Sequence, residues 1–241
     1  MSLNTSLVKF LNRIKFLILF LLLCSLSFAG LFFANQFFLI KNIEIVSDKK
    51  FSLTNKKELI NKNLIFANRD KIAKKIIKEN FPIEIATVEK IWPSTLKISI
   101  SFYEPCISMV VNNGFFELSC DGRILKKTKD VPQYLPVINY YQKLNSGSFQ
   151  TGDWIDYEDI KKVLFFVQRL KEINLTALTI DIKGQDMLVF NLIDGKQIIF
   201  SNSKDNNTQN YQLELIIKQF KIEGKEFKKI NLRFNKPIIS F

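Results

Sequence analysis

The stretch VEKIWPSTLKISISF, residues 88–102, predicts two β-strands joined by a tight turn at Trp92-Pro93-Ser94. After the turn, apolar and polar residues alternate from Thr95 to Tyr103. Because successive side chains of a strand point to opposite faces, the apolar residues share one face. We therefore expect a half-buried sheet that is covered by helices on one side.

The sequence upstream of this stretch predicts the rest of a small α+β unit. Its expected elements are a strand at Ile43–Val46, a helix from Thr54 to Asn63, a helix from Arg69 to Asn80 and a strand from Ile83 to Ile91. Thr54 is a suitable helix cap and Pro82 ends the second helix. The pattern predicts a βααββ unit over residues 41–104.

Downstream, residues 105–241 predict a second unit, a mixed β-sheet with two helices. Its expected elements are a hairpin (Cys106–Val111 and Phe115–Cys120), a strand at Arg123–Leu125, a helix opened by Asp153 or Asp156, strands at Ala177–Ile182, Leu188–Leu192 and Gln197–Phe200, a helix at Asn206–Lys221, and strands at Lys229–Phe234 and Ile238–Phe241. Residues 132–152 are read as a polar connection. The fold class is α+β.

The hairpin bears on two of the three cysteines. If Asn112-Asn113-Gly114 is the loop, Val111 pairs with Phe115, and Cys106 lies directly opposite Cys120. Directly opposed cysteines can form a disulfide, whereas a two-residue turn would shift the register and separate them. A disulfide and a pair of half-buried free thiols both remain open.

The N-terminal region predicts a single membrane-spanning helix over residues 16–40. No charged residue occurs there, and the most apolar part, Phe16–Ala34, has 19 residues, about the thickness of a bilayer at ~1.5 Å per residue. Lys9, Arg13 and Lys15 precede it, so residues 1–15 are expected to stay in the cytoplasm. The alternative is a signal peptide cleaved after Ala29.

Composition narrows the classes of function. The chain has no histidine, which excludes histidine triads and histidine metal sites. The net charge is +12, but its cations are mostly scattered lysines, and base and phosphate recognition favours arginine. We expect no nucleic acid, no small-molecule substrate, no cofactor and no metal, and we classify the protein as non-enzymatic.

Three local patterns resemble the FtsQ/DivIB family of bacterial cell-division proteins. Val88-x-x-x-Trp92-Pro93-x-x-Leu96-x-Ile98-x-Ile100, closed by Pro105, is similar to the end of that family's POTRA domain. Leu135-Pro136-Val137-Ile138 is similar to its Leu-Pro turn, and Ile230-Asn231-Leu232-Arg233-Phe234 to its "IDLRF" strand. The sequence departs from the family at Glu104, which is shifted, at Asn231, where the family has Asp, and at Ser201, where it commonly has Gly.

The resemblance implies a divisome scaffold in the bacterial plasma membrane, with a cytoplasmic N-terminus and an extracytoplasmic C-terminal domain at the division site. It implies FtsB/DivIC-like and FtsL-like bitopic partners. Translocation or assembly proteins with POTRA units, an anchored hydrolase and a secreted binding protein are the alternatives.

The candidate binding residues lie mainly at the C-terminus. The strand that starts at Ile238 follows Pro237, which has no amide proton, and this favours an edge position. An open edge can accept a strand from a partner, and in the resembled family the partner peptide docks in this region. The alternative is an ordinary edge that Pro237 and Lys236 protect from pairing. The candidate residues are Arg233, Phe234, Ile238, Ile239, Ser240 and Phe241. Trp92 and Pro93 are a second candidate contact, with packing against their own sheet as the structural alternative.

Overall fold

The computed structural model describes residues 3–54, 56–184 and 186–241, without the side chains of residues 3–15, 29, 31 and 34. The chain divides into two compact units, Met1–Phe102 and Tyr103–Phe241. This division lies two residues before the boundary expected between residues 104 and 105. The fold is α+β, with a β-sheet in each unit.

Helix α1, Leu3–Phe37, opens the first unit. The apolar side chains described along it, from Phe16 to Phe37, are exposed. The sequence predicts a cytoplasmic N-terminus from Lys9, Arg13 and Lys15. Their side chains lie outside the described residues.

Among the residues that the structure describes, no helix has the length and apolarity required to cross a membrane.

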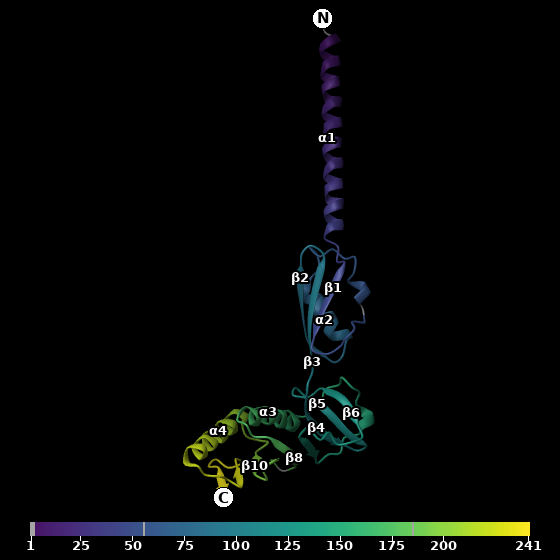
Figure 1. Cartoon of the computed structure of the whole chain (residues 1–241). Helices are drawn as coiled ribbons and strands as arrows, with labels where there is room; N and C mark the ends of the chain where they lie inside the picture. Colours follow the sequence, from purple (N-terminus) through teal and green to yellow (C-terminus); the bar gives the residue numbers. More distant parts are fainter. Residues whose placement is uncertain (1–2, 55, 185) are drawn as a thin grey trace. The chain divides into compact units, whose positions relative to one another are not determined.

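The rest of the first unit is a three-stranded sheet packed against one helix (Figure 1). Its strands are β1 (Asn42–Ser47), β2 (Ile83–Ile91) and β3 (Thr95–Phe102), in the order β1-β3-β2. β1 runs parallel to β3, and β2 runs antiparallel to it. The core contains the alternating apolar residues of β3 together with Ile76 of α2 (Arg69–Glu79), as their spacing predicts.

The helix predicted from Thr54 to Asn63 is wrong. Among the described residues of this range, a single 3-10 turn, Lys56–Glu58, is the only helical element. The backbone N–H and hydroxyl of Thr54 both donate to Oδ1 of Asn80, at 3.1 and 3.0 Å, so Thr54 is tied to the end of α2. Asn61 has a φ of 65°, a left-handed conformation that interrupts a helix. The unit is therefore not a βααββ unit, since one of its two helices is reduced to a turn.

The second unit is built on a nine-stranded sheet with the order β12-β11-β10-β9-β8-β7-β4-β5-β6. Its strands are β4 (Pro105–Val111), β5 (Gly114–Ser119), β6 (Ile124–Thr128), β7 (Val137–Tyr140), β8 (Ala177–Lys183), β9 (Met187–Leu192), β10 (Gln197–Phe200), β11 (Lys229–Asn231) and β12 (Ile238–Ser240). A short 3-10 turn, Ser146–Ser148, follows β7.

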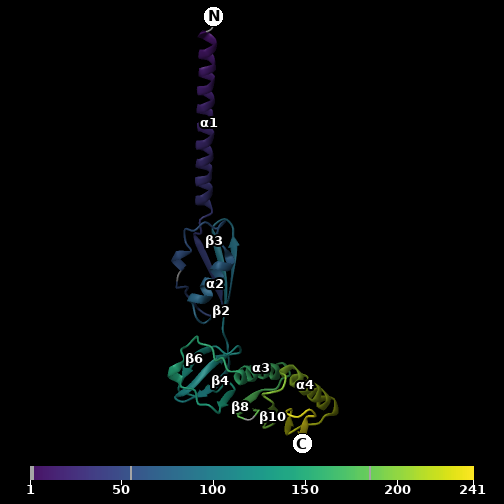
Figure 2. The same ribbon diagram turned by 180° about the vertical axis from the view of Figure 1, so that it is seen from behind.

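Two helices, α3 (Glu158–Glu172) and α4 (Asn206–Glu223), lie along the same face of this sheet (Figures 1 and 2). Their inward residues share one hydrophobic core with the strands. Phe166 of α3 stacks on Phe200 of β10, with ring centroids 3.8 Å apart. α3 begins at Glu158, after both aspartates from which the sequence predicted it to start.

Strand β7 is the element that the sequence analysis missed. It lies between β4 and β8 and runs parallel to both, and thereby joins the N-terminal hairpin to the rest of the sheet. Residues 132–152 were expected to be a polar connection. The strand has only four residues, which is too short for its alternation to stand out from the flanking turns.

Candidate partner-binding edge

Strand β12 forms one end of the nine-stranded sheet. It pairs antiparallel with β11, with Ile239 opposite Ile230 and Ser240 opposite Lys229. No other strand in the described part of the chain pairs with β12. One side of β12 is therefore an open edge, where backbone N–H and C=O groups lack ladder partners. This is the edge position that the sequence predicts for Ile238–Phe241.

The side chains of β12 point alternately toward the core and toward solvent. Ile239 is half-buried and packs against the main core. Ile238 and Phe241, in contrast, are 56% and 64% exposed, and Ser240 is also exposed. The open edge therefore carries apolar surface that the rest of this unit does not cover.

Helix α4 holds the edge in place. Its N-cap, Asp205, accepts a hydrogen bond from the backbone N–H of Thr208 at 2.7 Å, and this bond lowers the pKa of the Asp205 carboxyl. Farther along, Gln212 Nε2 donates to the carbonyl oxygen of Asn235, between β11 and β12, at 3.4 Å. The ring centroid of Phe220 lies 5.8 Å from that of Phe241. The terminal residues thus rest on α4 as well as on β11.

Arg233 and Phe234 lie in the bend between the two strands. β11 ends at Asn231, so the strand predicted over Lys229–Phe234 is three residues too long. Oδ1 of Asn231 accepts hydrogen bonds from the backbone N–H and from Nε of Arg233, both at 3.2 Å. Such a side-chain contact favours a turn over a continued strand. The guanidinium of Arg233 then lies 5.6 Å from the ring centroid of the half-exposed Phe234.

The segment that forms this edge is positively charged. Residues 227–241 contain Lys228, Lys229, Arg233 and Lys236 and no acidic residue. The three lysines are exposed. A cationic edge attracts segments that carry Asp or Glu and repels other basic segments. The sequence already contains this signal, although from the sequence the lysines are expected to form a solvated surface and Lys236 to protect the edge from pairing.

The other end of the sheet, β6, is covered by the chain itself. Ile124 N–H donates to the carbonyl of Asp153 at 2.9 Å, and Gly152 N–H donates to the carbonyl of Ile124 at 2.8 Å. Arg123 forms an isolated β-bridge with Trp154. Residues 152–155 thus occupy the outer side of β6 at Ile124, as an added strand would. Among the described residues, β12 has no comparable cover on its outer side.

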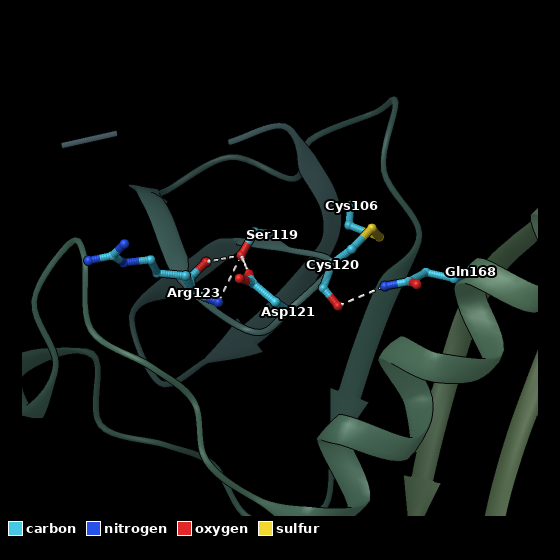
Figure 3. The surroundings of a disulfide bond; sticks show 6 residues. All are labelled: Cys106, Ser119, Cys120, Asp121, Arg123 and Gln168. Atoms are coloured by element: carbon cyan, nitrogen blue, oxygen red, sulfur yellow. Dashed lines mark hydrogen bonds between the residues drawn. A yellow bond between two sulfur atoms is a disulfide. The ribbon is translucent and has the colours of Figure 1, made fainter. Parts of the chain in front are cut away.

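Cys106 and Cys120 form a disulfide, with their Cα atoms 5.0 Å apart (Figure 3). The register that suggested this pairing is wrong, because Val111 pairs with Gly114 and the turn is the two-residue Asn112-Asn113. The pairing shifts between Pro105 and Ile107. Cys106 is the unpaired residue of this β-bulge beside Ser119, and it bonds to Cys120 although the two cysteines are not opposed in the hairpin register.

The disulfide joins the start of β4 to the chain just after β5, and neighbouring contacts fix the turn that follows it. Gln168 Nε2 of α3 donates to the carbonyl of Cys120 at 3.0 Å. Ser119 Oγ accepts from the backbone N–H of Arg123 at 2.9 Å and also bonds to Asp121 (Figure 3). These contacts direct the chain from β5 into β6, the covered edge.

Trp92 and Pro93 belong to the first unit and lie in the turn between β2 and β3. Trp92 is 55% exposed, and its ring meets the ring of Phe38 edge-on, with centroids 5.5 Å apart. Packing against the end of its own sheet, the structural alternative, therefore explains the position of only the buried part of the Trp92 side chain. The remainder faces solvent.

The comparisons with known proteins find likeness in structure and none in sequence. No family model matches the sequence, and no curated protein matches it either. Among solved structures, the major extracytoplasmic domain of the trans isomer of the cell-division protein DivIB from Geobacillus stearothermophilus is similar to this chain, with 20% sequence identity and a TM-score of 0.28. The match covers 42% of this chain and 81% of that one.

Proposed function

We propose that this protein is a bacterial cell-division scaffold of the FtsQ/DivIB type that captures a partner by adding a strand to β12. The observation that carries the proposal is the contrast between the two ends of the nine-stranded sheet. The start of β6 is covered by residues 152–155, whereas β12 has an open outer side and exposed apolar residues at Ile238 and Phe241. Exposed edges invite unwanted pairing, and proteins usually block them.

The chemistry of the edge selects the kind of strand that binds. Backbone hydrogen bonds to β12 provide affinity for an extended segment, and side chains provide selectivity. Ile238 and Phe241 favour apolar residues in the partner, and because they are three positions apart they lie on opposite faces of the extended segment. Lys228, Lys229 and Lys236 favour Asp or Glu beside them. The partner is therefore an extended segment with apolar and acidic residues, as a bitopic FtsB/DivIC-like protein would supply, with an FtsL-like protein in the same assembly.

Membrane anchoring through residues 16–40 completes the proposal. An anchor confines the protein and its bitopic partners to one surface, so that a weak contact between their outer domains is sufficient through effective concentration. Lys9, Arg13 and Lys15 would keep the N-terminus in the cytoplasm. The protein would then act at the division site without a reaction or a cofactor.

The test uses the full chain co-expressed with an FtsB/DivIC-like partner. Deletion of residues 237–241 removes β12 and should abolish co-purification, while the circular dichroism spectrum of the variant stays close to that of the parent. Ile193→Asp is the matched control, because Ile193 is 65% exposed in the same unit but lies away from β12; it should leave capture intact. Undiminished capture by the deletion variant would refute strand addition at this edge.

A further inference from the structure

The end of the first sheet nearest α1 carries exposed apolar side chains beside lysines. Ile65, Phe66, Ile91 and Trp92 are 45%, 82%, 42% and 55% exposed. We call these four residues, together with Lys41, Lys62 and Lys90, the rim. Phe66 and Trp92 are large aromatic side chains that the described residues leave largely uncovered.

Strand register places the rim where the chain leaves α1. Asn42, the first residue of β1, is opposite Thr95, and Thr95 is opposite Ile91. Lys41 N–H donates to the carbonyl of Ser94 at 2.9 Å, which joins the start of β1 to the turn that contains Trp92.

The loop that carries Phe66 is attached to the same place. Leu64 N–H donates to the carbonyl of Phe38 at 2.7 Å, and Ile40 N–H donates to the carbonyl of Lys62 at 2.9 Å. Lys90 Nζ donates to the carbonyl of Ile65 at 2.9 Å, so the loop is also tied to β2. Three segments distant in sequence thus meet within a few residues of the end of α1.

All charged residues of the rim are positive. Residues 35–41, 61–67 and 90–94 contain Lys41, Lys62 and Lys90 and no acidic residue. The nearest acidic residues along the chain are Glu44, Glu58, Asp70 and Glu89, and of these Glu58 and Glu89 are paired with Lys75 and Lys97. Aromatic side chains beside lysines are typical of protein surfaces that sit at the headgroup level of anionic membranes.

We propose that the rim inserts into the outer headgroup layer of the bilayer, as a second membrane contact beside α1. This inference rests on the membrane anchor of the proposed function. α1 ends at Phe37, and three extended residues span at most about 10 Å, so Ile40 and the rim lie close to the headgroup layer, which is ~5–8 Å thick on each side of the hydrocarbon core. Phe66 and Trp92 supply apolar contact, and the three lysines bind anionic headgroups.

The test is fluorescence of the full chain in nanodiscs of phosphatidylcholine and phosphatidylglycerol. Trp154→Phe leaves Trp92 as the only tryptophan. When the phosphatidylcholine is replaced by a form brominated near the headgroup, Trp92 should lose most of its emission. Co-elution of the protein with the nanodiscs reports separately on the anchor.

The matched control is Ile85→Trp in a chain that also carries Trp92→Phe and Trp154→Phe. Ile85 is 54% exposed and pairs with Ser101, at the far end of the same sheet, and six strand residues separate it from Ile91 by ~20 Å. This variant should keep most of its emission. If Trp92 in protein bound to nanodiscs is quenched no more than the control, the rim contact is refuted and the anchor stands. If the protein does not co-elute with nanodiscs, both are refuted.

A second measurement tests the lysines. Replacing Lys41, Lys62 and Lys90 together by Gln should lower the quenching of Trp92 in nanodiscs that contain phosphatidylglycerol, and should have little effect in pure phosphatidylcholine. The same loss in both lipids would show that the charges have no role in the contact.

Discussion

The two edge strands of the nine-stranded sheet differ in whether their outer backbone groups have partners. At β6, residues 152–155 supply backbone partners, and Ile155 is buried in the core beneath them. At β12, no described strand pairs with the outer side, and Ile238 and Phe241 are exposed. The comparison shows that this domain can cover a strand edge with its own chain. We therefore explain the open edge at β12 by partner binding and not by a lack of chain to cover it.

The largest expected effect is a difference in unfolding free energy between two Ile→Ala substitutions, one at each edge. Ile155→Ala opens a cavity under the cover of β6 and should lower the free energy of unfolding by about 2–5 kcal/mol. Ile238→Ala removes exposed side-chain atoms and should change it by no more than about 0.5 kcal/mol. Urea unfolding of both variants measures the difference. Equal losses would mean that β12 is as buried as the covered edge.

Removal of the disulfide should give the next largest effect. It should lower stability but leave partner capture at β12 unchanged, because the disulfide lies near β6, the covered edge. Its cysteines are 14 residues apart, and a loop of this size stabilises a protein by about 3 kcal/mol in the chain-entropy account. Cys106→Ser with Cys120→Ser should lose roughly that amount in urea unfolding and keep partner capture. Cys24→Ser is the control, since Cys24 is exposed in α1 and unpaired. Loss of capture in the double variant would show that the two sheet ends depend on each other.

A charge placed on the open edge should weaken binding without unfolding the domain. Ile238→Asp removes apolar surface and repels the acidic residues expected in the partner, so it should reduce partner affinity about tenfold, which corresponds to about 1.4 kcal/mol. Lys126→Ala on β6, where Lys126 is exposed, should leave affinity unchanged. Surface plasmon resonance with the partner's outer segment measures both. Equal effects of the two substitutions would remove the distinction between the edges.

The smallest effect is expected from the bend before β12. Asn231→Ala removes the acceptor of the two hydrogen bonds from Arg233 and should cost about 0.5–1.5 kcal/mol of unfolding free energy. Asn231→Asp keeps an acceptor and should cost less. Thermal unfolding monitored by circular dichroism compares them. If Asn231→Asp destabilises the domain as much as Asn231→Ala, the side-chain acceptor does not hold the bend.

The sequence by itself determined most of the local structure. The alternation after Trp92 and the helical spacing from Arg69 gave β3 and α2 within one residue of their observed bounds. The strands from Ala177 to Phe200 and the second helix of the β-domain were also found. These predictions succeeded because periodicities of 2 and 3.6 residues are local properties of an amphipathic segment.

Only the tertiary structure decided how those elements combine. β7 became a strand because β4 and β8 pair with it on both sides, and Cys106 met Cys120 although the hairpin register does not oppose them. The contrast between the two edges depends on residues 152–155, which fold back onto the start of β6. Sheet order and register arise from pairings between distant segments, and their free energies cannot be read from the pattern of any one segment.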